Sequence, residues 1–413
     1  MKQCRLRLCL IFLVAVCTRL SLLAQADISH SPKLLLSPQR LRRLQRDRER
    51  QTERWLNFEN RVNSVPDSPE RGFELALYYA VTQDKDRGSQ AVSWALAHPC
   101  EQRQVALVLD WAADQVSDIQ RKQLQKAACN SAHGGAIASR DALFMQVAGD
   151  EDVDELVDRT SKPLLAELQS GNWQNGADLY AAFEYLHVVR SVERTDLRLS
   201  CPQFFLSLPA ALLLSLKPEQ ISHPDWHIHI AALALVALDT NLTASQFLQG
   251  WALETQQTLR EGEGVAYEFL WADPYLPGVG FQNLDPWSYD GEGNLFARSD
   301  WSPDACWIHV SKSAVEEQHC SPGWQQQPAV FGHLTLFPMT ETCVQIPHRK
   351  IDETVVIWRL QPGQTVHYTL NNIPASVQAD AAGMWKVPNN AESKVCTSLD
   401  TLKVPQAHKS ARN

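Results

Sequence analysis

The sequence predicts an α+β protein with two domains, a helical region first and a strand-rich region after it. Between Gly72 and Leu259, apolar residues recur at helical spacing in segments several turns long, with short polar turns between them. After Asp290, short β-branched or aromatic runs alternate with Pro and Gly, which is typical of strands. With 413 residues, 44% of them apolar, the chain is long enough for one large or two medium domains with a sizeable core.

Residues 1–26 have the pattern of a secretory signal. Lys2, Arg5 and Arg7 precede an apolar run from Leu8 to Cys17, and Ala24-Gln25-Ala26 has the form of a cleavage site. The apolar run is too short to span a bilayer, and no later run of roughly 20 apolar residues occurs. We therefore expect a periplasmic or secreted protein without a stable membrane span.

Charge and cysteine content limit which classes of partner and which cellular compartment fit the sequence. Removal of residues 1–26 would take away four cations and no anion, and the net charge would change from −9 to −13. An acidic chain argues against a nucleic-acid partner, but it is compatible with an acidic glycan because a cleft can be locally basic. Seven cysteines remain after residue 26, an odd number, so at least one is expected outside intramolecular disulfides. A disulfide is expected between Cys306 and Cys320 or between Cys320 and Cys343.

The helical region is expected to consist of consecutive antiparallel hairpins. Residues 27–70 are polar and basic, with a short helical pattern from Leu34 to Leu44. Short polar turns favour hairpins, and the absence of a fixed-period repeat argues against a TPR or HEAT array. The expected helical segments are 73–80, 91–95, 105–116, 120–128, 136–147, 153–168, 177–192, 226–238 and 244–259.

A loop rich in Pro, Gly and aromatic residues separates the two regions. It runs from Trp271 to Trp287 and continues to Phe296–Trp301, and we interpret it as a wall that holds sugar rings. Strands are expected at 305–310, 329–337, 354–360 and 366–370. The expected domains are a helical one over 27–290, a β-sheet one over 291–388 and a polar tail over 389–413.

Five segments resemble known sequence motifs, and they occur in the same order along the chain as those motifs do. They are Gly72–Lys85, Val108–Leu124, His133–Asp150, Gly171–Tyr180 and Leu295–Trp307. Together they resemble the motifs of the heparinase II/III-like and alginate-lyase-like polysaccharide lyases. The resemblance implies an incomplete α/α toroid followed by a short, sandwich-like antiparallel β-sheet domain. It also implies β-elimination on an acidic, uronate-containing glycan at the cleft between the two domains, without a metal or other cofactor.

The chain also departs from these families. They continue with a Gly-Gly turn and an H-x-H-x-D-x-G-x-F run, whereas here the nearest strand has one histidine, His333, and no aspartate. The β region is also about half the length expected for the family. The alternative hypothesis is therefore a catalytically inactive glycan-binding or scaffold protein with the same fold.

Elimination from a uronate requires groups that neutralise the carboxylate, a base and an acid. On the motif match, Tyr180 is the candidate base or acid, and Asn130 and His133 are the candidates that polarise the carboxylate. His333 is the candidate β-domain histidine. The alternatives are structural: Tyr180 lies in an apolar helical segment, and Asn130 could cap the helix that follows it.

The candidate substrate-binding residues are an arginine, a histidine and four aromatic residues. Arg298 could hold a carboxylate through two parallel hydrogen bonds, or it could be a structural arginine that joins the domains. His187 lies on the same helical face as Tyr180. The aromatic candidates for stacking on sugars, which could instead belong to the core, are Trp173, Tyr275, Trp287 and Trp301, and Trp271 could form a further platform.

Two other kinds of site have less support in the sequence. The cluster His223, His227 and His229 lacks a clear third ligand, so no metal site is expected. A toroid glycoside hydrolase would need two carboxylates across a cleft, for which Asp273, Asp285 and Asp290 are available.

Overall fold

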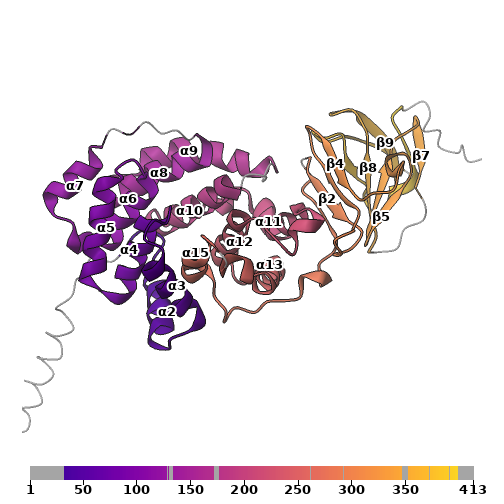
Figure 1. Cartoon of the computed structure of the whole chain (residues 1–413). Coiled ribbons are helices and arrows are strands. Elements are labelled where there is room, and N and C mark those ends of the chain that lie inside the picture. The colour runs from indigo at the N-terminus through magenta and orange to yellow at the C-terminus, as the bar shows by residue number, and fades with distance from the viewer. Residues whose placement is uncertain are drawn as a thin grey trace, which may run out of the picture.

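A computed structural model describes residues 32–127, 129, 134–171, 176–260, 262–291, 293–346, 352–371, 373–389 and 391–398. The expected signal, residues 1–26, lies outside the described residues. The expected α+β class is confirmed, with 14 α-helices in the described part followed by three small sheets (Figure 1). Within the described residues, no helix is both long enough and apolar enough to cross a membrane.

The helical part begins with two helices, of which the sequence pattern indicated the first only in part and the second not at all. Ser37 caps the first helix by accepting a hydrogen bond from the amide of Arg40, and Pro38 occupies the first turn. A further helix, α11, which contains Pro209, was not expected from the sequence. The helices are α2 (Pro38–Glu49), α3 (Glu53–Ser64), α4 (Arg71–Thr82), α5 (Lys85–Ala97), α6 (Gln102–Trp111), α7 (Asp118–Gln125), α8 (Gly135–Ala148), α9 (Asp154–Gln169), α10 (Gly176–Val192), α11 (Pro202–Ser215), α12 (Trp226–Leu238), α13 (Thr243–Glu254), α14 (Gln257–Arg260) and α15 (Val265–Trp271).

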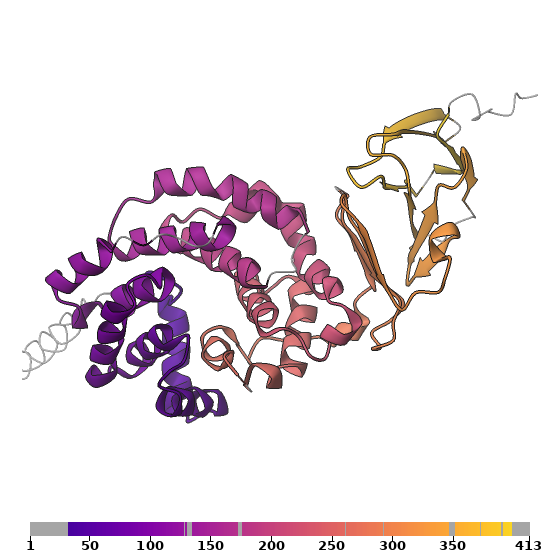
Figure 2. The ribbon, with the colours of Figure 1, turned by 45° about the horizontal axis from the view of Figure 1, so that its top comes forward.

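Contacts between alternate helices run through the helical part and return to its start. Helix α4 packs against α6, α6 against α8, α8 against α10 and α10 against α12. Helix α12 then packs against α15, α15 against α3, and α3 against α4. Helix α5 packs against α4 and α6, and α9 against α8 and α10, so these two helices lie beside the first series. Figure 2 shows the resulting curved layer of helices.

The first sheet joins the helical part to the rest of the β region. Strands β1 (Trp287–Tyr289), β2 (Leu295–Arg298), β3 (Trp307–Val310) and β4 (Val315–Gln318) are antiparallel. Phe296 and Trp307 belong to the apolar core of the helices, and the indole N–H of Trp307 donates to the carbonyl of Leu214 at 2.8 Å. The alternate residues Leu295 and Ile308 belong to a second core between the sheets.

The other two sheets correct the expectation of purely antiparallel pairing. Strands β5 (Ala329–Phe331), β6 (Leu334–Pro338), β8 (Thr354–Trp358) and β11 (Trp385–Lys386) form a sheet ordered β11-β8-β6-β5, in which β6 and β8 are parallel. The pairing is parallel because the chain leaves this sheet to form β7 (Cys343–Gln345) before it returns as β8. The third sheet has the order β10-β9-β12-β7, with β9 (Thr365–Leu370), β10 (Ile373–Gln378) and β12 (Ala391–Cys396). Strand β12 lies in the stretch expected to be a polar tail.

Three disulfides join six of the seven cysteines after residue 26. They are Cys100–Cys129, Cys306–Cys320 and Cys343–Cys396. The expected Cys306–Cys320 pair is confirmed, and its alternative, Cys320–Cys343, is wrong. The Cys343–Cys396 bond links β7 to β12, which are adjacent antiparallel strands, so the strand pairing places these two sulfurs together.

Candidate functional site

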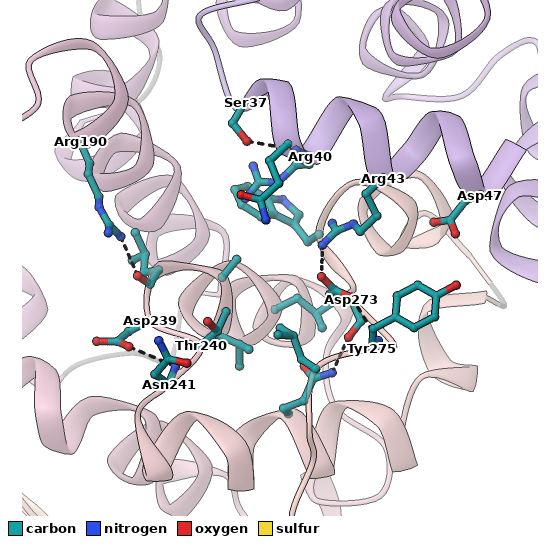
Figure 3. Close-up of a pocket in the computed structure, with 18 of the residues that line it drawn as sticks. Ser37, Arg40, Arg43, Asp47, Arg190, Asp239, Thr240, Asn241, Asp273 and Tyr275 are labelled. Carbon is teal, nitrogen blue, oxygen red and sulfur yellow. Dashed lines mark hydrogen bonds and ion pairs between the residues drawn. The ribbon is translucent and has the colours of Figure 1, made fainter.

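A strongly basic cavity lies between helix α2, the end of α12 and the segment that follows α15 (Figure 3). We name it the arginine pocket, and its volume is about 700 Å³. Its polar and aromatic lining residues are Ser37, Gln39, Arg40, Arg43, Arg46, Asp47, Arg50, Arg190, Arg198, Asp239, Thr240, Asn241, Gln249, Trp271, Asp273 and Tyr275. Six guanidinium groups therefore face three carboxylates.

Helix α2 and its C-cap residue supply four of the six arginines. Arg40, Arg43, Arg46 and Arg50 are spaced three or four residues apart, so they follow one face of the helix. Leu44, one turn after Arg40, is fully buried and anchors this polar helix to the core. All four of these arginines line the cavity.

The carboxylates of the arginine pocket are already shared with other cations. Asp273 pairs with Arg43 at 2.5 Å, and Asp239 lies 3.5 Å from Arg198. Asp47 pairs with Arg54, which does not line the cavity. Within the described residues, no carboxylate lies within ion-pair distance of the other three arginines that α2 and its C-cap present to the cavity, which are Arg40, Arg46 and Arg50.

An aromatic residue forms the inner wall of the arginine pocket. The guanidinium of Arg40 lies 4.2 Å from the centre of the Trp271 ring, an arrangement in which a cation interacts with the π face. Burial, and then the neighbouring charge of Arg43, lower the pKa of Arg40 to about 9. The His187 ring lies 4.6 Å from Trp271, and burial and Arg40 hold its pKa well below the ordinary value. His187 is therefore neutral at pH 7, with Nε2 2.9 Å from the Ala234 carbonyl.

Tyr180 lines a second, smaller cavity of about 410 Å³, which we name the Tyr180 pocket. Its hydroxyl donates to Glu184 at 2.6 Å and accepts from the Trp271 indole at 2.9 Å and from Arg103 at 3.4 Å. Tyr180 is only 3% exposed. Burial and the adjacent Glu184 raise the pKa of Tyr180 well above its ordinary value, although Arg103 opposes this. The phenol is therefore held in its protonated form.

The charges around the Tyr180 pocket are internally paired. Arg103 donates to Glu184 at 2.8 Å and to Glu70 at 3.1 Å, and Arg140 donates to Glu184 at 3.1 Å and pairs with Asp141. Glu70, Glu101 and Asp141 line this cavity, together with Arg103 and Arg140. The carboxylates thus outnumber the guanidiniums, so this cavity has no excess of positive charge for an anionic ligand.

A third cavity, of about 860 Å³, lies between the helices and the first sheet. Its charged lining residues are Lys217, Lys312 and Glu316, and Lys217 lies 4.0 Å from Glu316. His309 stacks on Phe296 with ring centres 4.2 Å apart, and burial lowers its pKa. None of the described residues expected to be catalytic or to bind substrate lines this cleft.

The residues expected from the sequence are dispersed. Of those that the structure describes, Tyr180 lines the Tyr180 pocket, Tyr275 lines the arginine pocket, and His187 packs behind the latter. His333 lies in the β region, where it is half exposed and its Nδ1 is 3.0 Å from Asp285. Asn130, His133 and Trp173 lie outside the described residues.

Arg298, Trp301 and Trp287 belong to the junction and to the first sheet. Arg298 is fully buried, with Nε donating to the Asp300 carbonyl at 2.8 Å and its guanidinium 4.5 Å from the Trp301 ring. Burial lowers its pKa to about 10. Trp301 packs against the helical core, and Trp287 is half-buried in β1. None of these three residues lines the arginine pocket or the Tyr180 pocket.

The remaining candidates also have structural partners. His229 is buried, with Nε2 3.3 Å from the Ala252 carbonyl, and no cluster of metal-ligating residues occurs within the described ranges. Of the carboxylates considered for hydrolysis, Asp273 pairs with Arg43 and Asp285 contacts His333. Asp273 and Asp285 therefore interact with different residues.

No protein-family model matches the chain, and no curated protein matches it.

Proposed function

We propose that the chain is an exported, periplasmic or secreted protein that binds an acidic, uronate-containing glycan without cleaving it. We further propose that its helices form an incomplete α/α toroid, followed by a sandwich-like β domain. The series of helix contacts that returns from α15 to α3 and α4 supports the toroid. The observation that carries the binding function is the arginine pocket, in which Arg40, Arg46 and Arg50 lack carboxylate partners among the described residues.

Binding without cleavage is favoured by the state of Tyr180. A base for the proton α to a carboxylate must lose its own proton at working pH, which for a tyrosine requires a lowered pKa. Here Tyr180 donates a hydrogen bond to Glu184 at 2.6 Å, and the pKa of Tyr180 is raised. The excess of carboxylates around the Tyr180 pocket would also repel a uronate.

A second candidate function is β-elimination at the Tyr180 pocket. One observation favours it: the Tyr180 oxygen accepts hydrogen bonds from Trp271 and from Arg103, and both donors would stabilise a phenolate. Arg103 and Arg140 could then neutralise a substrate carboxylate if they exchanged their present partners.

One set of experiments separates the two functions. The purified protein is titrated with polyuronates in a calorimeter, and the same mixtures are followed for the absorbance of unsaturated products. We expect saturable binding that weakens in Arg46→Gln and persists in Tyr180→Phe, with no product. An unsaturated product that disappears in Tyr180→Phe would replace our proposal with the lyase. An absence of binding to every acidic glycan would refute both functions.

A further inference from the structure

The uncompensated arginines of the arginine pocket are arranged in a line. Arg40, Arg46 and Arg50 lie on one face of α2, at intervals of six and four residues. An α-helix rises 1.5 Å per residue, so these Cα atoms span about 15 Å along the axis. Three positive charges over this length match an elongated anion better than a single carboxylate.

The facing wall has a different character. Arg190 and Arg198 lie there, but Asp196 is 3.7 Å from Arg190 and 2.7 Å from Arg198, and Asp239 is 3.5 Å from Arg198. This wall is therefore close to neutral, and it also presents the side chains of Thr240 and Asn241 (Figure 3). One wall thus offers cations and the other offers neutral hydrogen-bonding groups.

An aromatic ring lies near one end of this row of arginines. Tyr275 is 66% exposed, and its hydroxyl lies 3.5 Å from a terminal nitrogen of Arg50. An exposed phenol ring is a large, rigid and amphipathic surface, which suits contact with the apolar face of a sugar. Trp271, at the Arg40 end, is covered by Arg40 and His187 and is not open in the same way.

We propose that the arginine pocket binds a run of consecutive uronate residues lengthwise along α2. The carboxylates of successive sugars face Arg40, Arg46 and Arg50, the hydroxyls face Thr240 and Asn241, and a ring at the Arg50 end stacks on Tyr275. This assignment rests on the proposed glycan-binding function, and it specifies the ligand as a chain with closely repeated charges. A uronate monosaccharide reaches only one of the three arginines.

The test is a length series. Calorimetric titrations use galacturonate, its oligomers from two to six residues, and neutral malto-oligosaccharides of the same lengths. We expect affinity to rise with the number of uronates until the chain spans α2, and the neutral series to bind far more weakly. Arg40→Gln, Arg46→Gln and Arg50→Gln should each weaken binding of the hexamer about three- to tenfold and make it less sensitive to salt.

The controls distinguish the possible failures. Arg159→Gln, an exposed arginine of α9 outside this pocket, makes the same change in net charge and should bind the hexamer normally. Equal affinity for the monomer and the hexamer, or normal binding by all three α2 variants, would overturn the lengthwise assignment and leave the glycan-binding function standing. Binding of neutral oligomers as tightly as the hexauronate, or tighter binding of a single-stranded oligonucleotide, would overturn the ligand class. If no uronate polymer or oligomer binds, both proposals fail together.

Discussion

Replacement of Glu184 by glutamine would remove a charge that several buried groups share. The Glu184 side chain is fully buried and accepts hydrogen bonds from Arg103 at 2.8 Å, from Arg140 at 3.1 Å and from Tyr180 at 2.6 Å. Loss of one partner of a buried ion pair costs roughly 3–5 kcal/mol, because the opposite charge stays buried without compensation. Arg103 keeps Glu70 and Arg140 keeps Asp141, so we expect the lower end, about 3 kcal/mol.

Urea unfolding followed by far-UV circular dichroism measures this loss. Two control variants are measured in the same way. Tyr180→Phe removes only the hydroxyl, and it should cost about 1–2 kcal/mol. Glu155→Gln, at an exposed position of α9, should change the free energy of unfolding by no more than about 0.5 kcal/mol. If Glu184→Gln were no more destabilising than Glu155→Gln, the buried network would not support the fold as argued.

The same residue gives a dependence on pH whose sign follows from its surroundings. Burial alone would raise the pKa of Glu184, but the charges of Arg103 and Arg140 outweigh burial and hold this pKa below its ordinary value. The unfolded chain therefore takes up the proton at a higher pH than the folded chain does. The contribution of Glu184 is present above about pH 4.3 and is lost as the pH falls through the lowered folded value. In Glu184→Gln this part of the acid sensitivity should disappear.

The remaining predictions concern stability. Cys343 and Cys396 are 53 residues apart, and their joint replacement by serine should cost up to about 4 kcal/mol, measured as a lower urea midpoint under non-reducing conditions. Burial lowers the pKa of His229 to about 4, so the folded state disfavours the protonated ring. Roughly 3 kcal/mol of stability is therefore present above about pH 6.5 and should be lost as the pH falls toward 4. The free energy of unfolding of His229→Gln should depend less on pH. In Gly250→Ala the new Cβ would lie 2.0 Å from a backbone carbonyl oxygen, so the melting temperature should fall, whereas Gly262→Ala has open space and should match the wild type.

The sequence predicted well those helices whose apolar residues recur at the helical period throughout. The expected segment 226–238 coincides with α12, and 177–192 differs from α10 by one residue. Helix α2 was only partly indicated because its mean composition is strongly polar and only Leu44 among its apolar residues is buried. The parallel pairing of β6 with β8 depends on a strand that lies in another sheet, and no local pattern encodes that.

The site was harder to predict than the fold because its contacts join residues that are far apart in the sequence. The spacing of Arg40, Arg43, Arg46 and Arg50 was visible as one helical face, and it was the available signal for the arginine pocket. What turns this face into a site is the pairing of Asp273 with Arg43 rather than with its neighbours, across 230 residues of sequence. Likewise, the apolar helix around Tyr180 did not reveal that Arg103, 77 residues away, would contact the phenol.

The charge of the whole chain and the charge of the arginine pocket have opposite signs, and this affects how an acidic glycan could bind. The full chain has a net charge of −9, and of −13 without residues 1–26, so we expect a polyanion to be repelled at distances beyond the pocket and attracted close to α2. The Debye length is about 10 Å at 0.1 M salt, close to the estimated span of about 15 Å of the uncompensated arginines. Added salt should therefore first speed association, by screening the repulsion, and only at higher concentration shorten the lifetime of the complex. For a basic patch on a basic protein, the first addition of salt would lower both the association rate and the lifetime of the complex. Stopped-flow rates measured against salt concentration therefore test whether the attraction is confined to this pocket.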